Sequence, residues 1–415
     1  MNKRTSHRLL LAILIVLLFA VLAFIFKQQI GGINVPTSQK PTTGKTDITN
    51  QNPDGDPVIA KLTIPDGFAM NVFAKNVKDA RVIVFDAKAR MLVSETSEGR
   101  IAVLEDTNKD GVADTNRTLI SSLAKPHGLA LLCANSATPT ACTLFVAQQS
   151  KLVSYDYDTE TGTTTNPKKL LDIPATATDR HFTRTLQFLP DNLTLLISVG
   201  SSCNVCNETD AMRGRIMAYN ITTGKVGEYA RGLRNAVFMT LSPNGNVFAT
   251  EMGRDGLGDG IPPDEINLIQ ASKDYGWPNC YGKNVHDGVF DTNTYIRDPC
   301  TEPFETPSLV DLPAHSAPLG LAFMPSTWAT NPSGNLLVAY HGSWNSSVPT
   351  GYKIARVSFD TDGNYVGITD FISGWLTSDG TKLGRPVDLV FGSDNALYIS
   401  DDDTGTIYRL AKVLN

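Results

Sequence analysis

A pattern of paired apolar runs repeats six times along this chain of 415 residues. In each copy an apolar run is followed by a turn rich in Pro, Asp, Asn and Gly, and then by a second apolar run that ends in small or acidic residues. The runs are short, rich in Val, Leu, Ile, Phe and Thr, and bounded by turn residues, which is typical of strands. The copies lie at residues 82–96, 127–149, 185–201, 236–253, 319–343 and 387–403.

Six small sheets of this kind cannot each bury two faces alone, so closing them into a ring supplies the core. The repeat therefore predicts an all-β six-bladed β-propeller, with a pair of β-sandwiches as the alternative fold. The segment at residues 61–77 precedes the first copy. We expect it to add the outer strand to the last blade and so lock the ring.

The first residues differ from the rest of the chain. Residues 9–26 are 18 consecutive apolar residues, preceded by Lys3, Arg4 and Arg8. At about 1.5 Å each they nearly span a bilayer core of about 30 Å, and the basic flank predicts a cytoplasmic N-terminus. We expect residues 1–27 to form an uncleaved transmembrane helix, with a removed signal peptide as the alternative. The rest would then be membrane-anchored on the periplasmic or extracellular face, or secreted if the segment is cleaved.

Residues 28–57 are polar and have little to bury, which predicts a flexible linker before a propeller domain at residues 58–415. All 42 acidic residues follow residue 30, whereas four of the 36 basic residues precede it, so the later part carries a formal charge of 32 − 42 = −10. This charge argues against nucleic acid as a partner, because nucleic-acid binding relies on cationic surfaces.

The six cysteines fit an oxidising compartment. Two pairs could close surface segments, namely Cys133 with Cys142 and Cys280 with Cys300. Cys203 and Cys206 form a CxxC, for which a local structural disulfide, a redox role and free thiols all stay open. A zinc site would need about four ligands, and no second CxxC exists.

Basic and amide residues stand directly before the expected inner strands, where a propeller opens at one end of its channel. Four of the six histidines in the chain fall at these positions or at one strand end. Their recurrence at equivalent edges predicts one shared pocket. The residues concerned are His127, His181, Arg234, Asn235, His315, His341 and Arg385.

Six segments carry a more specific signal: HFTRTLQFLPDNLTLLISVGSSCNVC, ARGLRNAV, EMGRDGLGDGIPPDEINLI, YGWPNCYG, HSAPLGLAF and HGSWNSSVPTGYKIARV. In this order they resemble the glucose/sorbosone dehydrogenase family, over roughly residues 64–410, and most closely its sorbosone and aldose-sugar branch. The resemblance implies a six-bladed quinoprotein that binds pyrroloquinoline quinone (PQQ) and Ca²⁺. It also implies oxidation of an aldose or a sorbosone-like sugar at C1, with a respiratory electron acceptor or a small mediator as partner.

The resemblance also implies roles for individual residues. His181 would be the base that takes the proton from the anomeric hydroxyl as hydride leaves for the quinone, a task suited to an imidazole of ordinary pKa about 6.5. Arg234 would stabilise the negative charge that develops on the quinone oxygen, and Asn235 would hydrogen-bond the cofactor. A salt bridge to a loop acid is the structural alternative for Arg234.

Further cations are implied because PQQ carries three carboxylates. Arg385 and His341 would contact the cofactor, and His315 and His127 would line the pocket. Trp344 and Tyr352 would stack on sugar or cofactor, or belong to the blade core. In the soluble glucose dehydrogenases an acid precedes the catalytic histidine, whereas here Arg180 precedes His181 and Asp179 lies one step further back.

Calcium is implied at the loop after residue 250, where Gly253 and Arg254 would offer backbone carbonyls, the kind of oxygen ligand that calcium accepts. Glu251 or Asp264 could replace one carbonyl. A separate run, DTNKDGVAD, places Asp106, Asn108 and Asp110 in the spacing of the first half of a calcium loop, although Arg117 stands where the bidentate Glu is expected. A structural calcium and a solvated turn are both open there.

Two other functions compete with a dehydrogenase. A calcium-dependent, lactonase-like hydrolase would need a cage of carboxylates on the axis, and few acids stand at the expected strand openings. A propeller that only binds a sugar or a protein partner is the other alternative, although it leaves the set of His181, Arg234 and Asn235 without a purpose.

Overall fold

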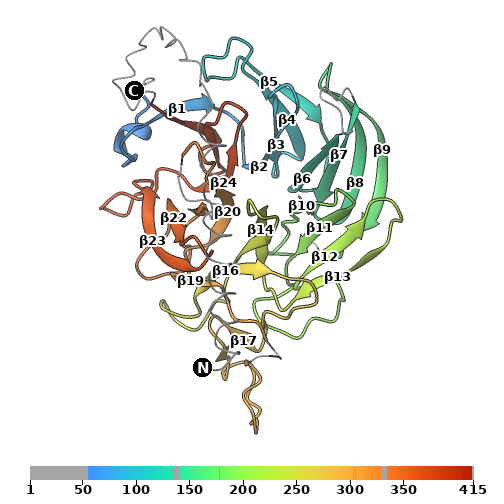
Figure 1. Cartoon of the computed structure of the whole chain (residues 1–415), viewed down its shortest axis with the longest axis vertical. Helices are drawn as coiled ribbons and strands as arrows, with labels where there is room; N and C mark the ends of the chain where they lie inside the picture. Colours follow the sequence, from blue (N-terminus) through green and yellow to red (C-terminus); the bar gives the residue numbers. More distant parts are fainter. Residues whose placement is uncertain are drawn as a thin grey trace, which may run out of the picture. The chain divides into compact units, whose positions relative to one another are not determined.

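The computed structural model describes residues 55–133, 141–176, 178–301, 303, 305–328 and 334–413. In these ranges it contains six four-stranded antiparallel sheets, one two-stranded hairpin and a single 3-10 turn at Ile59–Lys61 (Figure 1). The six-bladed all-β propeller is therefore confirmed. The expected transmembrane helix at residues 1–27 and most of the linker at residues 28–57 lie outside the described residues. Among the residues that are described, no helix has the length and apolar character needed to cross a membrane.

The blades follow one another along the chain. Blade 1 contains β2 (Ala80–Phe85), β3 (Met91–Glu95), β4 (Arg100–Glu105) and β5 (Thr115–Ile120). Blade 2 contains β6 (Leu129–Cys133), β7 (Ala141–Gln148), β8 (Lys151–Asp158) and β9 (Thr163–Asp172). Blade 3 contains β10 (Leu186–Phe188), β11 (Thr194–Val199), β12 (Arg215–Asn220) and β13 (Val226–Arg231).

Blade 4 contains β14 (Ala236–Leu241), β15 (Val247–Glu251), β16 (Asp264–Ile269) and β19 (Val310–Leu312). The hairpin of β17 (Cys280–Tyr281) and β18 (Val285–His286) is inserted before β19. Blade 5 contains β20 (Pro318–Phe323), β21 (Asn335–Tyr340), β22 (Lys353–Phe359) and β23 (Tyr365–Ile372). Blade 6 contains β24 (Pro386–Phe391), β25 (Leu397–Asp401), β26 (Thr406–Lys412) and β1 (Phe68–Ala74).

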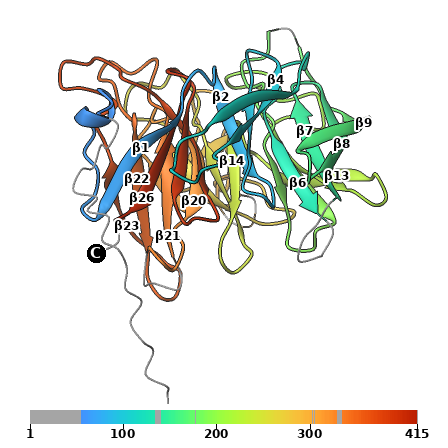
Figure 2. The same cartoon turned by 90° about the horizontal axis from the view of Figure 1, so that it is seen from above.

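The ring closes through its innermost strands. β2, β6, β10, β14, β20 and β24 surround the centre in Figure 1, and each contacts the next, with β24 returning to β2. The predicted locking strand is confirmed, because β1 pairs antiparallel with β26 from Phe68 opposite Lys412 to Ala74 opposite Ile407, and the two lie side by side in Figure 2. Blade 6 thus combines the first strand of the propeller with the last three, and this pairing closes the ring.

Burial falls from the inside of each blade to its outside. The second strands β3, β15 and β25 are buried along their whole length, whereas the outer strand β5 has no buried residue. A strand covered on both faces has to be apolar or have its polar groups hydrogen-bonded. The core lies between neighbouring sheets, as where Phe145 of blade 2 packs with Leu195 of blade 3.

Hydroxyl groups connect successive blades at the same level. Thr96 donates to the carbonyl of Pro126, Thr250 to that of Leu319, and Ser400 to that of Arg81, each at 2.7 Å. The partner carbonyls of the last two belong to innermost strands β20 and β2, whose pairing with the second strand is interrupted by a β-bulge in this region. A bulge turns one side chain away from the regular alternation. It allows residues such as Arg81 and Leu319 to face the channel.

All six cysteines lie in disulfides, so the two expected pairs are confirmed, and the CxxC is also a disulfide. Cys133 and Cys142 are opposite each other on β6 and β7. Cys280 and Cys300 close the inserted hairpin, and Cys203–Cys206 lies in the loop between β11 and β12.

Candidate active site

A cavity of about 760 Å³ opens at one end of the channel and is lined by residues of blades 1, 3, 4 and 5. These residues come from the starts of innermost strands and from the ends of second strands, because both meet at the same end of an antiparallel blade. The predicted residues that line it are His181, Arg234, Asn235, Gly253, Asp264, His315, His341 and Trp344.

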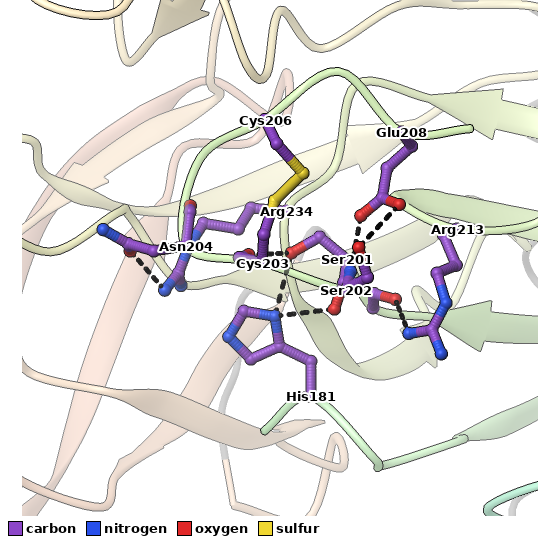
Figure 3. Close-up of a disulfide and its surroundings, with 10 residues drawn as sticks. His181, Ser201, Ser202, Cys203, Asn204, Cys206, Glu208, Arg213 and Arg234 are labelled. Carbon is purple, nitrogen blue, oxygen red and sulfur yellow. Dashed lines mark hydrogen bonds between the residues drawn. A yellow bond between two sulfur atoms is a disulfide. The ribbon is translucent and has the colours of Figure 1, made fainter. Parts of the chain in front are cut away.

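His181 lies in the segment before β10, with its ring against the disulfide loop of the same blade (Figure 3). Its Nδ1 is 2.9 Å from the Oγ of Ser201 and 3.1 Å from the carbonyl oxygen of Ser201. Nε2 has no hydrogen-bond partner within the described residues. One ring nitrogen is therefore anchored and the other is available to a ligand.

The electrostatic surroundings of His181 keep its imidazole neutral. Burial lowers its pKa to about 3, and the positive charge of Arg234 acts in the same direction, followed by those of Arg184 and Arg213. The charged imidazolium is disfavoured because desolvation and nearby cations both penalise it. A histidine of this kind can accept a proton at neutral pH without first losing one.

Asp179 does not support His181, although it lies two residues before it. Its carboxylate is buried and pairs with Arg213, whose Nη2 lies 2.8 Å and 3.0 Å from the two oxygens. Ser201 occupies the supporting position instead. The one available sequence signal for Ser201 was its place at the end of a second apolar run, two residues before Cys203 of the CxxC.

Arg234 is 5% exposed and is held mainly by backbone and amide oxygens. Its Nε donates to the carbonyl of Asn204 at 2.8 Å, Nη2 to Oδ1 of Asn204 at 2.9 Å, and Nη1 to the carbonyl of Met252 at 3.2 Å. The expected alternative, a salt bridge to a loop acid, is also present as a longer contact of 3.4 Å to Asp255. The guanidinium is thus fixed at the cavity wall by three hydrogen bonds to neutral oxygens and one longer ion-pair contact.

Asn235 lies between blades 3 and 4 at the cavity wall. Its backbone N–H donates to Glu251 at 2.9 Å. Residue 200, which faces both His181 and Asn235, has to be a glycine. A Cβ at this position would lie 2.7 Å from the Cβ of His181 and 2.8 Å from Oδ1 of Asn235. The glycine lets the predicted base and the predicted cofactor-binding amide approach each other.

His341 lines the cavity just after β21 and is part of a hydrogen-bonded set that the sequence did not indicate. Its Nε2 lies 2.8 Å from Asp402, whose other oxygen accepts from Arg81 at 2.6 Å. Burial raises the pKa of Asp402, but His341 and Arg81 outweigh this and hold it well below its usual range. Arg81 also lines the cavity and adds a cation from blade 1.

Arg385 and Tyr352 support this edge from behind and are not among the lining residues. Arg385 donates from Nε to the carbonyl of His341 at 3.0 Å and from Nη2 to that of Gly342, and its guanidinium lies 5.4 Å from the ring centre of Tyr352. Tyr352 is buried and donates to the carbonyl of Ser343. For Tyr352 the structure therefore favours the core alternative, and Arg385 acts on the strand end that carries His341.

His315 and Trp344 lie at the cavity as expected. His315 lines it and its Nε2 is 2.9 Å from the carbonyl of Gly258, while Trp344 lines it with 72% of its surface exposed. His127 differs from the expectation that it lines the pocket. It is fully buried, its ring packs edge-on against Phe238, and Nδ1 is 3.5 Å from Thr185, because the segment before β6 turns into the ring.

The loop after β15 meets the requirement for backbone oxygen ligands in part. Within the described residues no hydrogen bond is accepted by the carbonyl of Gly253 or of Arg254. The side chain of Arg254 turns away from the cavity and pairs with Asp287 in the segment after β18, at 2.9 Å for its Nη2. Arg254 is not a lining residue of the cavity and lines the smaller space behind its wall, so of the two predicted carbonyl donors only Gly253 is a cavity residue.

The two acids named as alternative ligands have different surroundings. Asp264 lines the cavity, but its oxygens already accept from Gly253 and Ala317, both at 2.9 Å, and from Ser316 at 3.1 Å. Burial raises its pKa to about 6. Glu251 faces a smaller space behind the cavity wall, and burial next to Glu265 raises its pKa well above the usual range.

The Asp-rich loop at residues 106–114 connects β4 and β5 away from the cavity. Asp106 accepts from the backbone N–H groups of Lys109 at 2.7 Å and Gly111 at 2.9 Å, and Asn108 from that of Asp110 at 2.9 Å. These bonds describe a turn closed by its own side chains, the second of the two open alternatives. A calcium ion at Asp106, Asn108 and Asp110 stays a prediction.

Fold and cavity together define a class, namely a six-bladed propeller with a ligand site of imidazoles and arginines at one end of its channel. The model of the TrAA12-like family matches residues 62–413, so this chain belongs to the TrAA12-like family. The predicted relationship to quinoprotein sugar dehydrogenases is confirmed by this membership together with the relatives that follow.

Three curated relatives resemble most of the chain. A protein of Borreliella burgdorferi is 30% identical over 362 residues, covering 85% of this chain and 91% of the relative. The pyrroloquinoline quinone-dependent sugar dehydrogenase of Hypocrea jecorina is 25% identical over 95% of this chain and 96% of its own length. The pyrroloquinoline quinone-dependent pyranose dehydrogenase of Coprinopsis cinerea is 24% identical over 85% of this chain, which spans only 55% of that enzyme.

Two solved structures agree with the fold. The holo form of the pyranose dehydrogenase PQQ domain from Coprinopsis cinerea superposes with a TM-score of 0.71 at 21% identity, covering 84% of this chain and 96% of that one. The calcium structure of the family AA12 protein of Trichoderma reesei gives a TM-score of 0.72 at 22% identity, covering 85% and 97%.

Proposed function

We propose that this protein is a PQQ- and Ca²⁺-dependent dehydrogenase that oxidises an aldose or a sorbosone-like sugar at C1, with His181 as the base. Membership of the TrAA12-like family and relatives named as PQQ-dependent sugar dehydrogenases support this over a lactonase-like hydrolase or a propeller that only binds a partner. The observation that carries the proposal is a neutral imidazole with a free Nε2, beside a fixed arginine, in one cavity.

The cavity residues fit an anionic cofactor. Arg81, Arg180, Arg234 and His341 all line it, and Arg234 is buried with its ion-pair contact to Asp255 as long as 3.4 Å. Burial without a full counter-charge is costly for a guanidinium, so an anion placed here would offset that cost. The free carbonyls of Gly253 and Arg254 are suited to holding calcium near the same wall. When bound, the quinone supplies the acceptor for two electrons.

The protein's own residues would then have separate tasks. Nε2 of His181 accepts the proton of the sugar hydroxyl, because Nδ1 is engaged with Ser201. Arg234 stabilises negative charge at the cavity wall, where low exposure strengthens its effect. Negative charge in the cavity also counteracts the effect of Arg234 on the pKa of His181. It raises this pKa, and the imidazole becomes a stronger base.

The domain organisation and location are proposals as well. We place a dehydrogenase domain at residues 58–415 behind a linker at residues 28–57, anchored outside the cytoplasm by residues 1–27. The three disulfides fit an oxidising compartment. A respiratory acceptor or a small mediator would then take the electrons.

The test is dye reduction by the purified protein with PQQ, Ca²⁺ and a panel of aldoses and pyranoses. His181→Ala should bind PQQ, seen by its absorbance, and lose roughly 10²- to 10⁴-fold in kcat, the contribution expected of a positioned base.

Trp344→Ala serves as the matched variant at the cavity rim and should alter KM for the sugar more than kcat. If no sugar reduces the dye although PQQ binds, the proposed reaction is wrong. Full activity of His181→Ala would remove His181 from the role of base.

A further inference from the structure

The Cys203–Cys206 disulfide lies beside both side chains to which the proposed reaction assigns chemistry. The loop that it closes follows β11 and runs along the cavity wall, where Ser202, Cys203 and Asn204 are lining residues. Figure 3 shows His181 on one side of this loop and Arg234 on another. Neither the base nor the cation belongs to the loop, yet both are bonded to it.

The hydrogen bonds of Ser201 determine which ring nitrogen of His181 carries the proton. The Ser201 hydroxyl donates its one proton to the carbonyl of Cys203 at 2.7 Å. Its Oγ can therefore only accept from the imidazole, and the Ser201 carbonyl can only accept as well. Nδ1 of a neutral His181 must then carry the ring proton, which leaves Nε2 unprotonated. The Ser201 carbonyl and the Ser201 hydroxyl, which the Cys203 carbonyl orients, thus together select the tautomer that a base requires.

The next residue of the loop holds the arginine. The backbone carbonyl of Asn204 accepts a hydrogen bond from Nε of Arg234 at 2.8 Å, and its side-chain Oδ1 accepts one from Nη2 at 2.9 Å. The same amide bonds the backbone of Asp255 in both directions, at 2.8 Å and 2.9 Å. Four bonds therefore depend on where one exposed residue between two cysteines is placed.

Packing contributes little to holding this loop in position. Ser202 and Asn204 are exposed and both cysteines are only half-buried, with Glu208 capping the loop through Ser202 Oγ at 2.9 Å. The disulfide joins residues three apart in sequence, and such short loops contribute least to global stability in the chain-entropy view. Its effect is expected to be local.

We propose that the Cys203–Cys206 loop is a positioning element that sets the tautomer of His181 and the orientation of Arg234 together. Opening the disulfide would then disable the pair while the propeller stays folded. The catalytic consequence rests on the proposed function, whereas the tautomer is a property of the protein itself and can be measured without cofactor or substrate.

The primary experiment compares two double variants of the full chain, Cys203→Ser/Cys206→Ser and, as the matched control, Cys133→Ser/Cys142→Ser. The control opens a disulfide between β6 and β7 that is not at the cavity. Imidazole ¹⁵N spectra at neutral pH, with the His181 signals assigned by their loss in His181→Gln, report which ring nitrogen is protonated. The wild type and the control should show the Nδ1–H form alone, and the Cys203/Cys206 variant a mixture.

Activity with PQQ and Ca²⁺ gives the second readout. The Cys203/Cys206 variant should lose roughly 10- to 100-fold in kcat with little change in KM or in the unfolding midpoint, as for a small misplacement of reacting groups. Ser201→Ala keeps the disulfide and removes one of the two groups that accept from Nδ1, so it should show a smaller shift toward the Nε2–H form, even if the double variant folds poorly.

A wild-type tautomer in both the Cys203/Cys206 variant and Ser201→Ala would overturn the proposal. A tautomer shift in a protein that oxidises no sugar would instead support the positioning role and refute the proposed reaction.

Discussion

At the scale of single residues, two histidines expected in one pocket have opposite surroundings. His181 presents a free Nε2 to the cavity, whereas His127 is fully buried and its Nε2 has no partner within the described part of the chain. Burial, and next the charge of Arg81, hold the pKa of His127 well below its usual range. The sequence placed both at equivalent strand starts, but only the packing around each ring separates a candidate base from a core residue.

The burial of His127 predicts a pH dependence of stability. Because its pKa is lowered by folding, the unfolded chain takes up a proton below about pH 6.5 and the folded protein does not, so stability falls with decreasing pH. Below pH 6.5 this single group lowers the free energy of unfolding by at most about 1.4 kcal/mol per pH unit. His127→Gln should therefore lose less free energy of unfolding between pH 6.5 and pH 5 than the wild type. Denaturant titrations of the cofactor-free protein at the two pH values measure it, and equal losses would contradict the assignment.

At the scale of elements, β1 is decisive because it joins the first strand of the fold to the last blade. Met70 lies on this strand with no exposed surface and packs with Leu337 of blade 5 and Leu397 of blade 6. One side chain therefore contributes to the core between two blades as well as to the closure of the ring.

We expect Met70→Ala to lower the free energy of unfolding by about 2–5 kcal/mol, the range for a buried large-to-small change. Val366→Ala, on the outer strand β23 and 66% exposed, is the matched control and should stay within about 0.5 kcal/mol. Urea unfolding followed by tryptophan fluorescence would measure both. A loss at Met70 no larger than at Val366 would mean that β1 is dispensable for closure.

At the scale of the whole molecule, the cavity exists only because four blades converge. Arg81 and Asp402 are separated by 321 positions in sequence, and their contact supports His341 from a third blade. A ligand that bridges such blades binds the closed ring and not the unfolded chain, so it must stabilise the fold.

PQQ with Ca²⁺ should therefore raise the unfolding midpoint of the whole protein. At one hundred times the dissociation constant the gain is about 2.7 kcal/mol. Removing Ca²⁺ with a chelator should reverse part of the gain, and adding it back should restore it, as followed by differential scanning calorimetry. An unfolding midpoint that changes neither with PQQ nor with Ca²⁺ would argue against a cofactor site in this cavity.

Signals between near neighbours in the sequence were sufficient to predict the architecture. Periodic apolar runs, turn residues and the extra strand at residues 61–77 define six blades and their closure, since these signals depend on neighbours along the chain. The same repeat placed cations at strand starts, and His181, Arg234 and Asn235 were identified as a set through resemblance.

Only the tertiary structure decided which of these residues share a cavity and what supports them. Arg385 and His127 are not among the residues that line the cavity, whereas Arg81 is. Asp179 forms an ion pair with Arg213, and Ser201 is the residue that contacts Nδ1 of His181. The physical reason is that strand formation depends on residues a few positions apart, whereas hydrogen bonds and desolvation depend on distances between blades, which exist only after the ring has closed.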